Sequence, residues 1–342
     1  MIRTRFALVA ASVALAATLV LAGAQPSQAA TIGYADALGQ LATACGADIN
    51  RFCSKANLGG GEVAECLERH SDRVSAACKV AAAETGALIR RRSQARASVA
   101  QICELDRLKF CGGIQPGDAQ ILGCMFQARR NLSNACHQAL IDSGYEAALD
   151  PGPLGSQIHL SGPDILSSLV GVERTNVGIT VSRLRAMAAA AAHDPSRADP
   201  THRAPLYAQL NSLSQLTLAI EFDFDSARIK PKSYRAIGLM ADALYHPVLY
   251  GYCFLIVGHT DATGRRDYNL GLSERRARAI QAALVNPFGI SPVRVDEVGL
   301  GEEQLLDPSR PKSGVNRRVQ LINIGQIAGN PQCPVVPLQD IR

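Results

Sequence analysis

The sequence contains no tryptophan, and aromatic residues make up only 5% of its 342 residues. Any hydrophobic core must therefore be built mainly from aliphatic side chains. Beyond the N-terminus the sequence has no apolar run of the roughly 18 to 20 residues that a membrane-spanning helix needs. The formal net charge is only +5 and the basic residues are dispersed, so the sequence gives no support for nucleic-acid binding.

Residues 1–30 are typical of a secretory signal. Arg3 and Arg5 precede an apolar, helix-forming segment at residues 6–24, and residues 27–29 (Ser-Gln-Ala) offer small side chains for cleavage. An uncleaved membrane anchor is the alternative, whereas the absence of a following cysteine argues against a lipoprotein. Cleavage would remove two arginines and no acid, which lowers the net charge from +5 to +3. We therefore expect a periplasmic protein, in a compartment where disulfides form.

Eight of the ten cysteines form a tandem repeat. Within each copy the cysteines are separated by 7, 12 and 11 residues, and the two copies are offset by 58 residues. Asp48 and Asp106 keep this offset, as do Ser75 and Ser133. Such a correspondence indicates a duplicated segment. The cysteines are Cys45, Cys53, Cys66 and Cys78 in the first copy and Cys103, Cys111, Cys124 and Cys136 in the second.

Each copy is predicted to be a helical hairpin. Ala, Leu, Arg and Glu dominate around the outer cysteines and favour helix, whereas glycines interrupt the middle. Two antiparallel helices would join the inner cysteines near the turn and the outer ones at the open end. Four cysteines allow three pairings, of which the hairpin suggests one. The suggested pairs are Cys45–Cys78, Cys53–Cys66, Cys103–Cys136 and Cys111–Cys124.

A zinc site is the alternative use of these cysteines. Structural zinc usually takes ligands two to four residues apart, and no two cysteines have that spacing. We therefore expect neither a metal nor a cofactor, and we interpret His70 and His137 as helix-surface residues. The run at residues 90–92 (Arg-Arg-Arg) is interpreted as a solvated helix face, with a patch for an anionic polymer as the alternative.

The cysteine pattern, with Asp-Ile-Asn-Arg-Phe-Cys at residues 48–53, resembles the cysteine-rich repeats of the Golgi apparatus protein 1 family over about residues 42–140. The resemblance implies a disulfide-bonded extracytoplasmic module without catalytic residues or a defined ligand. We place the repeats at residues 40–145, with the two copies at 45–78 and 103–136. Residues 146–212 follow as a proline- and glycine-interrupted spacer with some helix, or as a docking segment for a partner.

Residues 213–325 show the order β-α-β-α-β-β. The first strand begins near Leu216, with alternating apolar residues through Phe224 on one face. Helices are expected at residues 231–246 and about 273–285, and further strands at 253–258, 295–300 and 318–324. This order predicts an α+β fold with helices packed on one mixed sheet, preceded by the all-α repeats. Residues 326–342 form a proline-rich tail; Cys333 in this tail either forms a disulfide with Cys253 or both thiols are free.

Asp261 lies just past a predicted strand, and Arg276 lies in the next predicted helix, for which Ser273 is a candidate N-cap. A carboxylate and a guanidinium that converge in one cleft can bind a zwitterion through its ammonium and its carboxylate. An internal salt bridge between Asp261 and Arg276 is the alternative. His259 is interpreted as structural, because no serine or cysteine nucleophile with a base is evident, and we expect no enzymatic activity.

Three separated motifs closely resemble the OmpA-like family: residues 222–227 (FDFDSA), 258–277 and 316–319 (NRRV). The resemblance implies non-covalent binding of peptidoglycan, which would tether an exported protein or the outer membrane to the cell wall of a Gram-negative bacterium. It places the diaminopimelate of the stem peptide on Asp261 and Arg276 and side contacts on Thr263, Asn269 and Arg317. Asp225 stands where relatives often carry asparagine, which leaves its role open. Arg317 and Arg318 alternate along a strand, so only one of them can face the cleft. The alternative function is a wall-associated scaffold that binds a protein partner through its cysteine-rich repeats.

Overall fold

The computed structural model describes residues 32–114, 120–145, 167–170, 180–203, 206, 210–211 and 213–326, which belong to one compact unit. The predicted signal peptide, much of the predicted spacer and Cys333 lie outside the described residues. None of the helices within these stretches is long and apolar enough to cross a bilayer.

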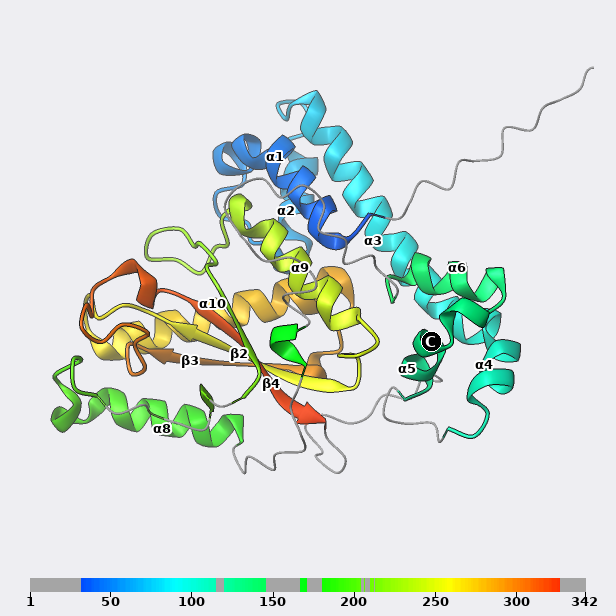
Figure 1. Ribbon diagram of the computed structural model, residues 1–342. Helices are drawn as coiled ribbons and strands as arrows, with labels where there is room; N and C mark the ends of the chain where they lie inside the picture. Colours follow the sequence, from blue (N-terminus) through cyan, green and yellow to red (C-terminus); the bar gives the residue numbers. More distant parts are fainter. Residues whose placement is uncertain are drawn as a thin grey trace, which may run out of the picture. The chain divides into compact units, whose positions relative to one another are not determined.

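The elements that the structure describes in the N-terminal region are all helical (Figure 1). Over the described residues each copy of the repeat involves three α-helices rather than the predicted two, because a short helix surrounds its second inner cysteine, Cys66 or Cys124. The long helix α3 begins in the first copy and ends where the second begins, so it joins the two copies rigidly. The elements are α1 (Tyr34–Phe52), η1 (Gly59–Gly61), α2 (Glu62–Arg69), α3 (Ala76–Ile102), α4 (Glu104–Cys111), α5 (Gln120–Gln127), η2 (Arg129–Asn131) and α6 (Asn134–Ser143).

The cysteines pair within each copy, as the hairpin interpretation suggests. Cys45–Cys78 joins α1 to the start of α3, and Cys53–Cys66 joins the end of α1 to α2. Cys103–Cys136 and Cys111–Cys124 repeat the arrangement in the second copy. The corresponding Cα–Cα distances are similar in the two copies, 4.5 and 4.8 Å for the outer pairs and 5.8 and 6.1 Å for the inner pairs. The described bridges therefore follow the duplication of the sequence.

The two polar pairs that share the offset of 58 residues form the same contact in each copy. Ser75 caps α3 by accepting a hydrogen bond from Cys78 N, and its hydroxyl donates to Asp48 Oδ2 over 2.8 Å. Ser133 caps α6 in the same way and donates to Asp106 Oδ2 over 2.6 Å. A serine cap that is itself held by a carboxylate fixes the helix start beside the outer disulfide.

The C-terminal region folds as a four-stranded mixed sheet with the predicted β-α-β-α-β-β order, which confirms the α+β fold class. The sheet order is β1-β4-β2-β3; β2 is parallel to β3, and β4 is antiparallel to β1 and β2. The elements are β1 (Gln215–Leu218), η5 (Pro231–Ser233), α9 (Tyr234–Tyr245), β2 (Tyr252–His259), α10 (Arg266–Phe288), η6 (Pro292–Arg294), β3 (Val295–Gly301), η7 (Gly314–Asn316) and β4 (Val319–Gln326).

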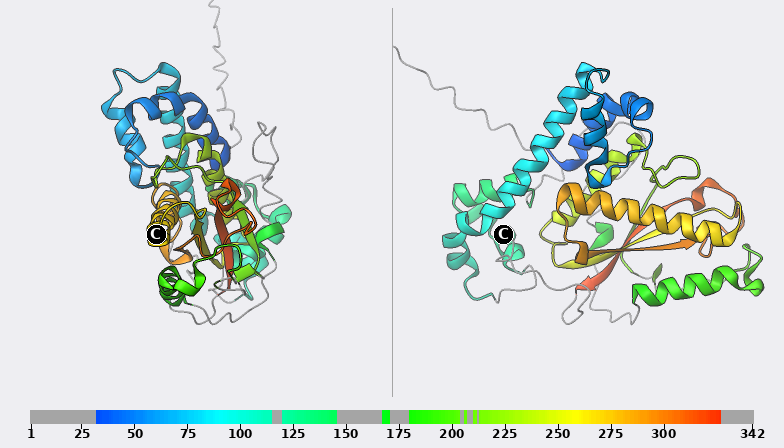
Figure 2. Two further views of the ribbon diagram at one scale, coloured as in Figure 1. Left: turned by 90° about the vertical axis from the view of Figure 1, so that its left-hand side faces the viewer. Right: turned by 180° about the vertical axis from the view of Figure 1, so that it is seen from behind.

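The two faces of the sheet are covered by different parts of the chain. Phe254 and Ile256 of β2 belong to the core that includes α9 and α10, whereas Leu255 and Val257 point to the other face, as the strand period of two requires. That second face packs against Leu184 and its neighbours in α8 (Val181–His193), which runs beside β3 (Figures 1 and 2). The helix expected in the spacer is therefore present, and it is part of the core. The 3-10 turn η3 (Pro195–Arg197) follows it.

Two local predictions in the C-terminal region are wrong. α10 begins at Arg266, so Ser273 is not its N-cap; Ser273 is buried inside the helix, where its hydroxyl donates to Leu270 O and accepts from Gly301 N. A serine can remain within a helix when its hydroxyl bonds to a preceding carbonyl. The first strand ends at Leu218, and Phe224 is 99% exposed instead of sharing the buried face. The reason is a turn, in which Asp225 has φ of 54° and reverses the chain.

The arginine run at residues 90–92 is also only partly a solvated face. Arg90 and Arg91 are exposed, but Arg92 is completely buried. Leu88, Arg92 and Arg96 follow each other at intervals of four residues, so they share the face of α3 that packs inward. This spacing explains why Arg90 and Arg91 face solvent while Arg92, the last member of the run, does not.

Candidate functional site

A cleft of about 1030 Å³ opens in the C-terminal region between three segments. One side is the loop at residues 221–230, called the wall loop below; the others are the β2–α10 loop and the segment that leads into β4. All six residues that the sequence proposes as ligand contacts line this cleft. They are Asp225, Asp261, Thr263, Asn269, Arg276 and Arg317.

Asp261 is held at the bottom of the cleft. Its backbone neighbours are fixed because Thr260 N donates to Gly301 O over 2.8 Å and Ala262 N donates to Pro311 O over 3.0 Å. The carboxylate accepts hydrogen bonds from Thr263 N over 3.1 Å and from Arg317 Nη1 over 2.5 Å. Asp261 therefore forms its ion pair with Arg317 and not with Arg276, and its oxygens keep lone pairs that an ammonium group can use.

Arg276 enters the cleft from α10 and is half-buried. Its Nε donates to Ser226 O over 2.9 Å, and its guanidinium lies 4.9 Å from the centroid of the Phe222 ring. Burial lowers the pKa of Arg276, and the neighbouring charge of Arg317 lowers it further. Two guanidinium groups and one carboxylate thus share the centre of the cleft, and a ligand carboxylate would reduce the repulsion between the two cations.

Asn269 supports the loop that carries Asp261. The side chain is buried, and its amide nitrogen donates to Thr263 O over 3.1 Å and to Glu302 Oε2 over 2.6 Å, with a longer bond to Asp261 O at 3.3 Å. Thr263 contributes its backbone N–H to Asp261. In this structure these residues hold the carboxylate in place and leave the open space to Asp261 and the arginines.

The rim of the cleft carries residues that the sequence reasoning missed. The Tyr268 hydroxyl donates to the carboxylate of Asp225, and this hydrogen bond raises the pKa of Tyr268. Phe224 lies beside Asp225, fully exposed, and Phe222 lies beneath the Arg276 guanidinium. The motif at residues 222–227 contains both phenylalanines, each of which directly precedes an aspartate. This pairing of an aromatic residue with an acid is the sequence signal that could have indicated their place at the cleft.

His259 and Arg318 are buried residues that also line the cleft. His259 Nε2 is 2.5 Å from Gln320 Oε1, and burial holds the pKa of His259 well below its usual value. Arg318 donates to Gln304 O over 3.1 Å, and burial lowers the pKa of Arg318 to about 10. Of the two neighbouring arginines, Arg317 is the one that reaches Asp261. Over the described ranges, no three His, Cys, Asp or Glu side chains gather as a metal site.

Cys253 lies in β2, buried and disulfide-bonded. The partner that the sequence suggests, Cys333, lies outside the described residues. Cys253 is therefore not a free thiol, whereas its pairing with Cys333 stays a prediction.

Comparison with known families and proteins confirms both resemblances. Residues 221–318 match the OmpA family, and residues 39–75 match a cysteine rich repeat. The chain is 38% identical over 109 residues to outer membrane porin F of Pseudomonas aeruginosa, a match that covers 31% of this chain and 30% of the porin. It is 37% identical over 102 residues to the peptidoglycan-associated lipoprotein of the same organism, which covers 29% of this chain and 58% of the lipoprotein.

Each of the two Pseudomonas relatives matches less than a third of this chain. This chain covers less than two thirds of the length of either relative. Among solved structures, an outer membrane protein from Borrelia burgdorferi is 29% identical, with a TM-score of 0.27 over 32% of this chain and 88% of that chain.

Proposed function

Residues 221–318 form an OmpA family domain, and from this premise we propose that its cleft binds the peptidoglycan stem peptide without covalent chemistry. In this proposal Asp261 receives the ammonium group of diaminopimelate, and Arg276 and Arg317 receive the adjacent carboxylate. The exported chain is thereby fixed to the cell wall in the periplasm. We assign no catalytic step to the cleft.

The observation that carries the proposal is the arrangement of charge at the centre of the cleft. Asp261 is buried, anchored through its backbone and already hydrogen-bonded, so it needs little reorganisation to accept an ammonium group. Arg276 has its Nε on Ser226 O, which leaves the outer edge of its guanidinium directed away from that carbonyl. A planar guanidinium edge matches a carboxylate in a bidentate pair.

Co-sedimentation with sacculi tests this proposal. The chain without its predicted signal, residues 31–342, should sediment with sacculi that contain diaminopimelate, whereas Asp261→Ala and Arg276→Ala should stay in the supernatant. Arg275→Ala and Asp267→Ala are matched controls, because these exposed residues lie on the same helix and bear the same charges. Folded Asp261→Ala and Arg276→Ala proteins that still sediment would contradict the assignment.

A scaffold that binds a protein partner remains the second candidate function. The observation that favours it is on α4, where Leu105 is 80% exposed and Leu108 is 54% exposed. Large exposed apolar side chains on one helix are a common feature of protein interfaces. In a pull-down of periplasmic proteins with residues 31–342, a partner lost on Leu105→Glu but kept on Arg276→Ala would support this second role.

A further inference from the structure

We propose that the first cysteine-rich repeat is part of the ligand site: through Asn57 and its neighbours it holds the wall loop and thereby positions Arg276. This inference rests on the proposed function of the cleft. It assigns to the repeat a role in binding that is separate from any partner of its own.

The wall loop has few internal contacts that could fix its position. It is a short hairpin in which Asp223 N donates to Arg228 O over 3.0 Å and Lys230 N donates to Glu221 O over 2.9 Å, with one isolated bridge between Phe222 and Ile229. An isolated two-stranded hairpin is marginally stable in water. Its position must therefore depend on contacts with the surrounding structure.

Asn57, in the first repeat, contacts the wall loop with both ends of its side-chain amide. The amide nitrogen donates to Ala227 O over 2.8 Å, and the amide oxygen accepts from Ile229 N over 3.2 Å. These two bonds bracket Arg228. Because an asparagine amide has a donor end and an acceptor end, it can replace the strand neighbour that this side of the hairpin lacks.

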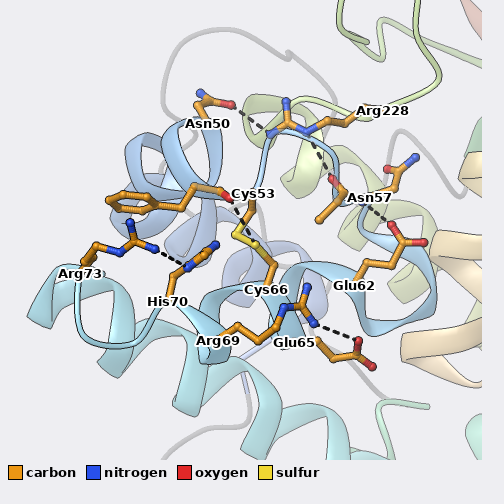
Figure 3. The surroundings of a disulfide bond; sticks show 12 residues. Asn50, Cys53, Asn57, Glu62, Glu65, Cys66, Arg69, His70, Arg73 and Arg228 are labelled. Carbon is orange, nitrogen blue, oxygen red and sulfur yellow. Dashed lines mark hydrogen bonds and ion pairs between the residues drawn. A yellow bond between two sulfur atoms is a disulfide. The ribbon is translucent and has the colours of Figure 1, made fainter.

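Arg228 reaches back from the wall loop into the same part of the repeat (Figure 3). Its side chain is buried, its Nε donates to Ala56 O over 3.2 Å, and its Nη2 donates to Asn50 Oδ1 over 3.2 Å. Its Nη1 pairs with Asp223, across the hairpin, over 2.5 Å. One buried guanidinium thus joins the repeat to both strands of the wall loop.

The segment of the repeat that makes these contacts is itself constrained. The disulfide Cys53–Cys66 closes the loop that contains Asn57, and Asn57 N donates to Glu62 Oε2 over 2.8 Å (Figure 3). In the same loop, Gly59 lies so close to α10 that a Cβ atom would meet Ala282 at 2.8 Å. The loop is therefore held against the domain at a fixed distance.

The residue that Asn57 holds is the sequence neighbour of the residue that holds Arg276. Ser226, whose carbonyl accepts the hydrogen bond of Arg276 Nε over 2.9 Å, immediately precedes Ala227, which Asn57 holds. Phe222, beneath the guanidinium, belongs to the same loop. Fixing the wall loop therefore fixes the orientation of Arg276 before ligand arrives, which reduces the entropic cost of binding.

The second repeat provides a matched comparison. Cys111–Cys124 has the same sequence separation of 13 residues as Cys53–Cys66. Among the described residues, the hydrogen bonds to the wall loop from the cysteine-rich region come from Asn50, Ala56 and Asn57 in the first copy. Loss of either disulfide removes the same type of cross-link, but within the described ranges Cys53–Cys66 is the one whose loop forms hydrogen bonds with the wall loop.

The experiment uses residues 31–342 and the tripeptide L-Ala-γ-D-Glu-meso-diaminopimelate as the probe, with affinity measured by calorimetry well below each protein's melting temperature. We expect Cys53→Ser/Cys66→Ser and Asn57→Ala to weaken binding about tenfold or more. Cys111→Ser/Cys124→Ser and Asn131→Ala, an exposed residue of the second copy, should change it less than about twofold. Arg228→Lys, which keeps one charged donor, should weaken binding less than Arg228→Ala.

The NMR signal of the Arg276 Nε–H group gives a second readout that needs no ligand. The hydrogen bond to Ser226 O should give a slowly exchanging signal, which Asn57→Ala should shift or broaden and Asn131→Ala should leave unchanged. If the wild-type chain does not bind the tripeptide, the proposed function fails, and this signal still decides the positioning role. Equal affinity losses in the two disulfide variants, or an Asn57→Ala protein with wild-type affinity and an unchanged Arg276 signal, would overturn the inference.

Discussion

Arg92 and Asp242 form a buried ion pair, 3.0 Å apart, between the long helix of the cysteine-rich region and the first helix of the OmpA family domain. Asp242 also accepts hydrogen bonds from Tyr34 N and Ala35 N at the start of α1, and Arg92 donates to Ile32 O. The guanidinium lies 4.4 Å from the centroid of the Tyr34 ring. Three segments that are distant in sequence therefore meet at one charge pair.

Removing one member of this pair should destabilise the whole unit. Arg92→Met leaves the Asp242 carboxylate buried without its counter-charge, which costs about 3 to 5 kcal/mol in comparable sites. Arg91→Met, on the exposed side of the same helix, should change the free energy of unfolding by less than about 0.5 kcal/mol. Denaturant unfolding of both variants measures the difference. Similar values for the two would show that the pair does not hold the repeats to the domain.

The serine caps of the two repeats should contribute equally. Ser75→Ala and Ser133→Ala each remove an N-cap and leave the partner carboxylate, Asp48 or Asp106, without its hydroxyl donor. A lost serine cap typically costs about 1 kcal/mol. We expect similar decreases in the free energy of unfolding from the two substitutions, measured by denaturant titration. A large loss in one copy and none in the other would mean that the duplicated contacts are not equivalent in stability.

Acidification should destabilise the domain through His259. Burial first, and the charge of Arg318 second, hold the pKa of His259 well below its usual value, so the folded state favours the neutral ring. Its contribution to stability is therefore present above about pH 6.5, the unfolded-state value, and decreases as the pH falls below it. The decrease is at most about 1.4 kcal/mol per pH unit for one proton.

A substitution isolates the contribution of His259. His259→Gln should flatten the dependence of the unfolding free energy on pH between about 6.5 and 4.5. The difference between the wild-type and His259→Gln curves removes the contribution of carboxylates that titrate in the same pH range, because both proteins contain them. Parallel curves for wild type and His259→Gln would show that His259 is not held neutral by the fold.

Sequence periodicity and cysteine spacing predicted the helices and strands that are determined by residues close together in the sequence. The cysteine spacing predicted helical, disulfide-bonded repeats, and alternation with helical periodicity predicted the order of the C-terminal strands and helices. The three motifs that resemble the OmpA-like family contain the six candidate residues, which the structure places in one cleft. The helices and strands could be predicted because neighbouring residues determine them, whereas the candidate cleft residues came from three separated motifs of one family.

The features that the sequence did not predict depend on contacts between distant segments. Arg92 belongs to a charged run, and only the packing of α3 on Asp242, 150 residues away, buries it. The helix of the spacer could not be assigned to the sheet, because its apolar face gives no information about which surface it covers. Nothing in the sequence around Asn57 indicates that its side-chain amide contacts a loop 170 residues away.

The central claim is that the cleft recognises a zwitterion, and one calorimetric comparison tests it most directly. Residues 31–342 are titrated with L-Ala-γ-D-Glu-meso-diaminopimelate and with the tripeptide that carries L-lysine instead, which keeps the side-chain ammonium but lacks the carboxylate beside it. Charge-assisted hydrogen bonds contribute about 1.5 to 3 kcal/mol. We therefore expect the diaminopimelate tripeptide to bind at least about tenfold more tightly, with the difference lost in Arg276→Ala. Equal affinities of the wild-type chain for the two tripeptides would contradict the account.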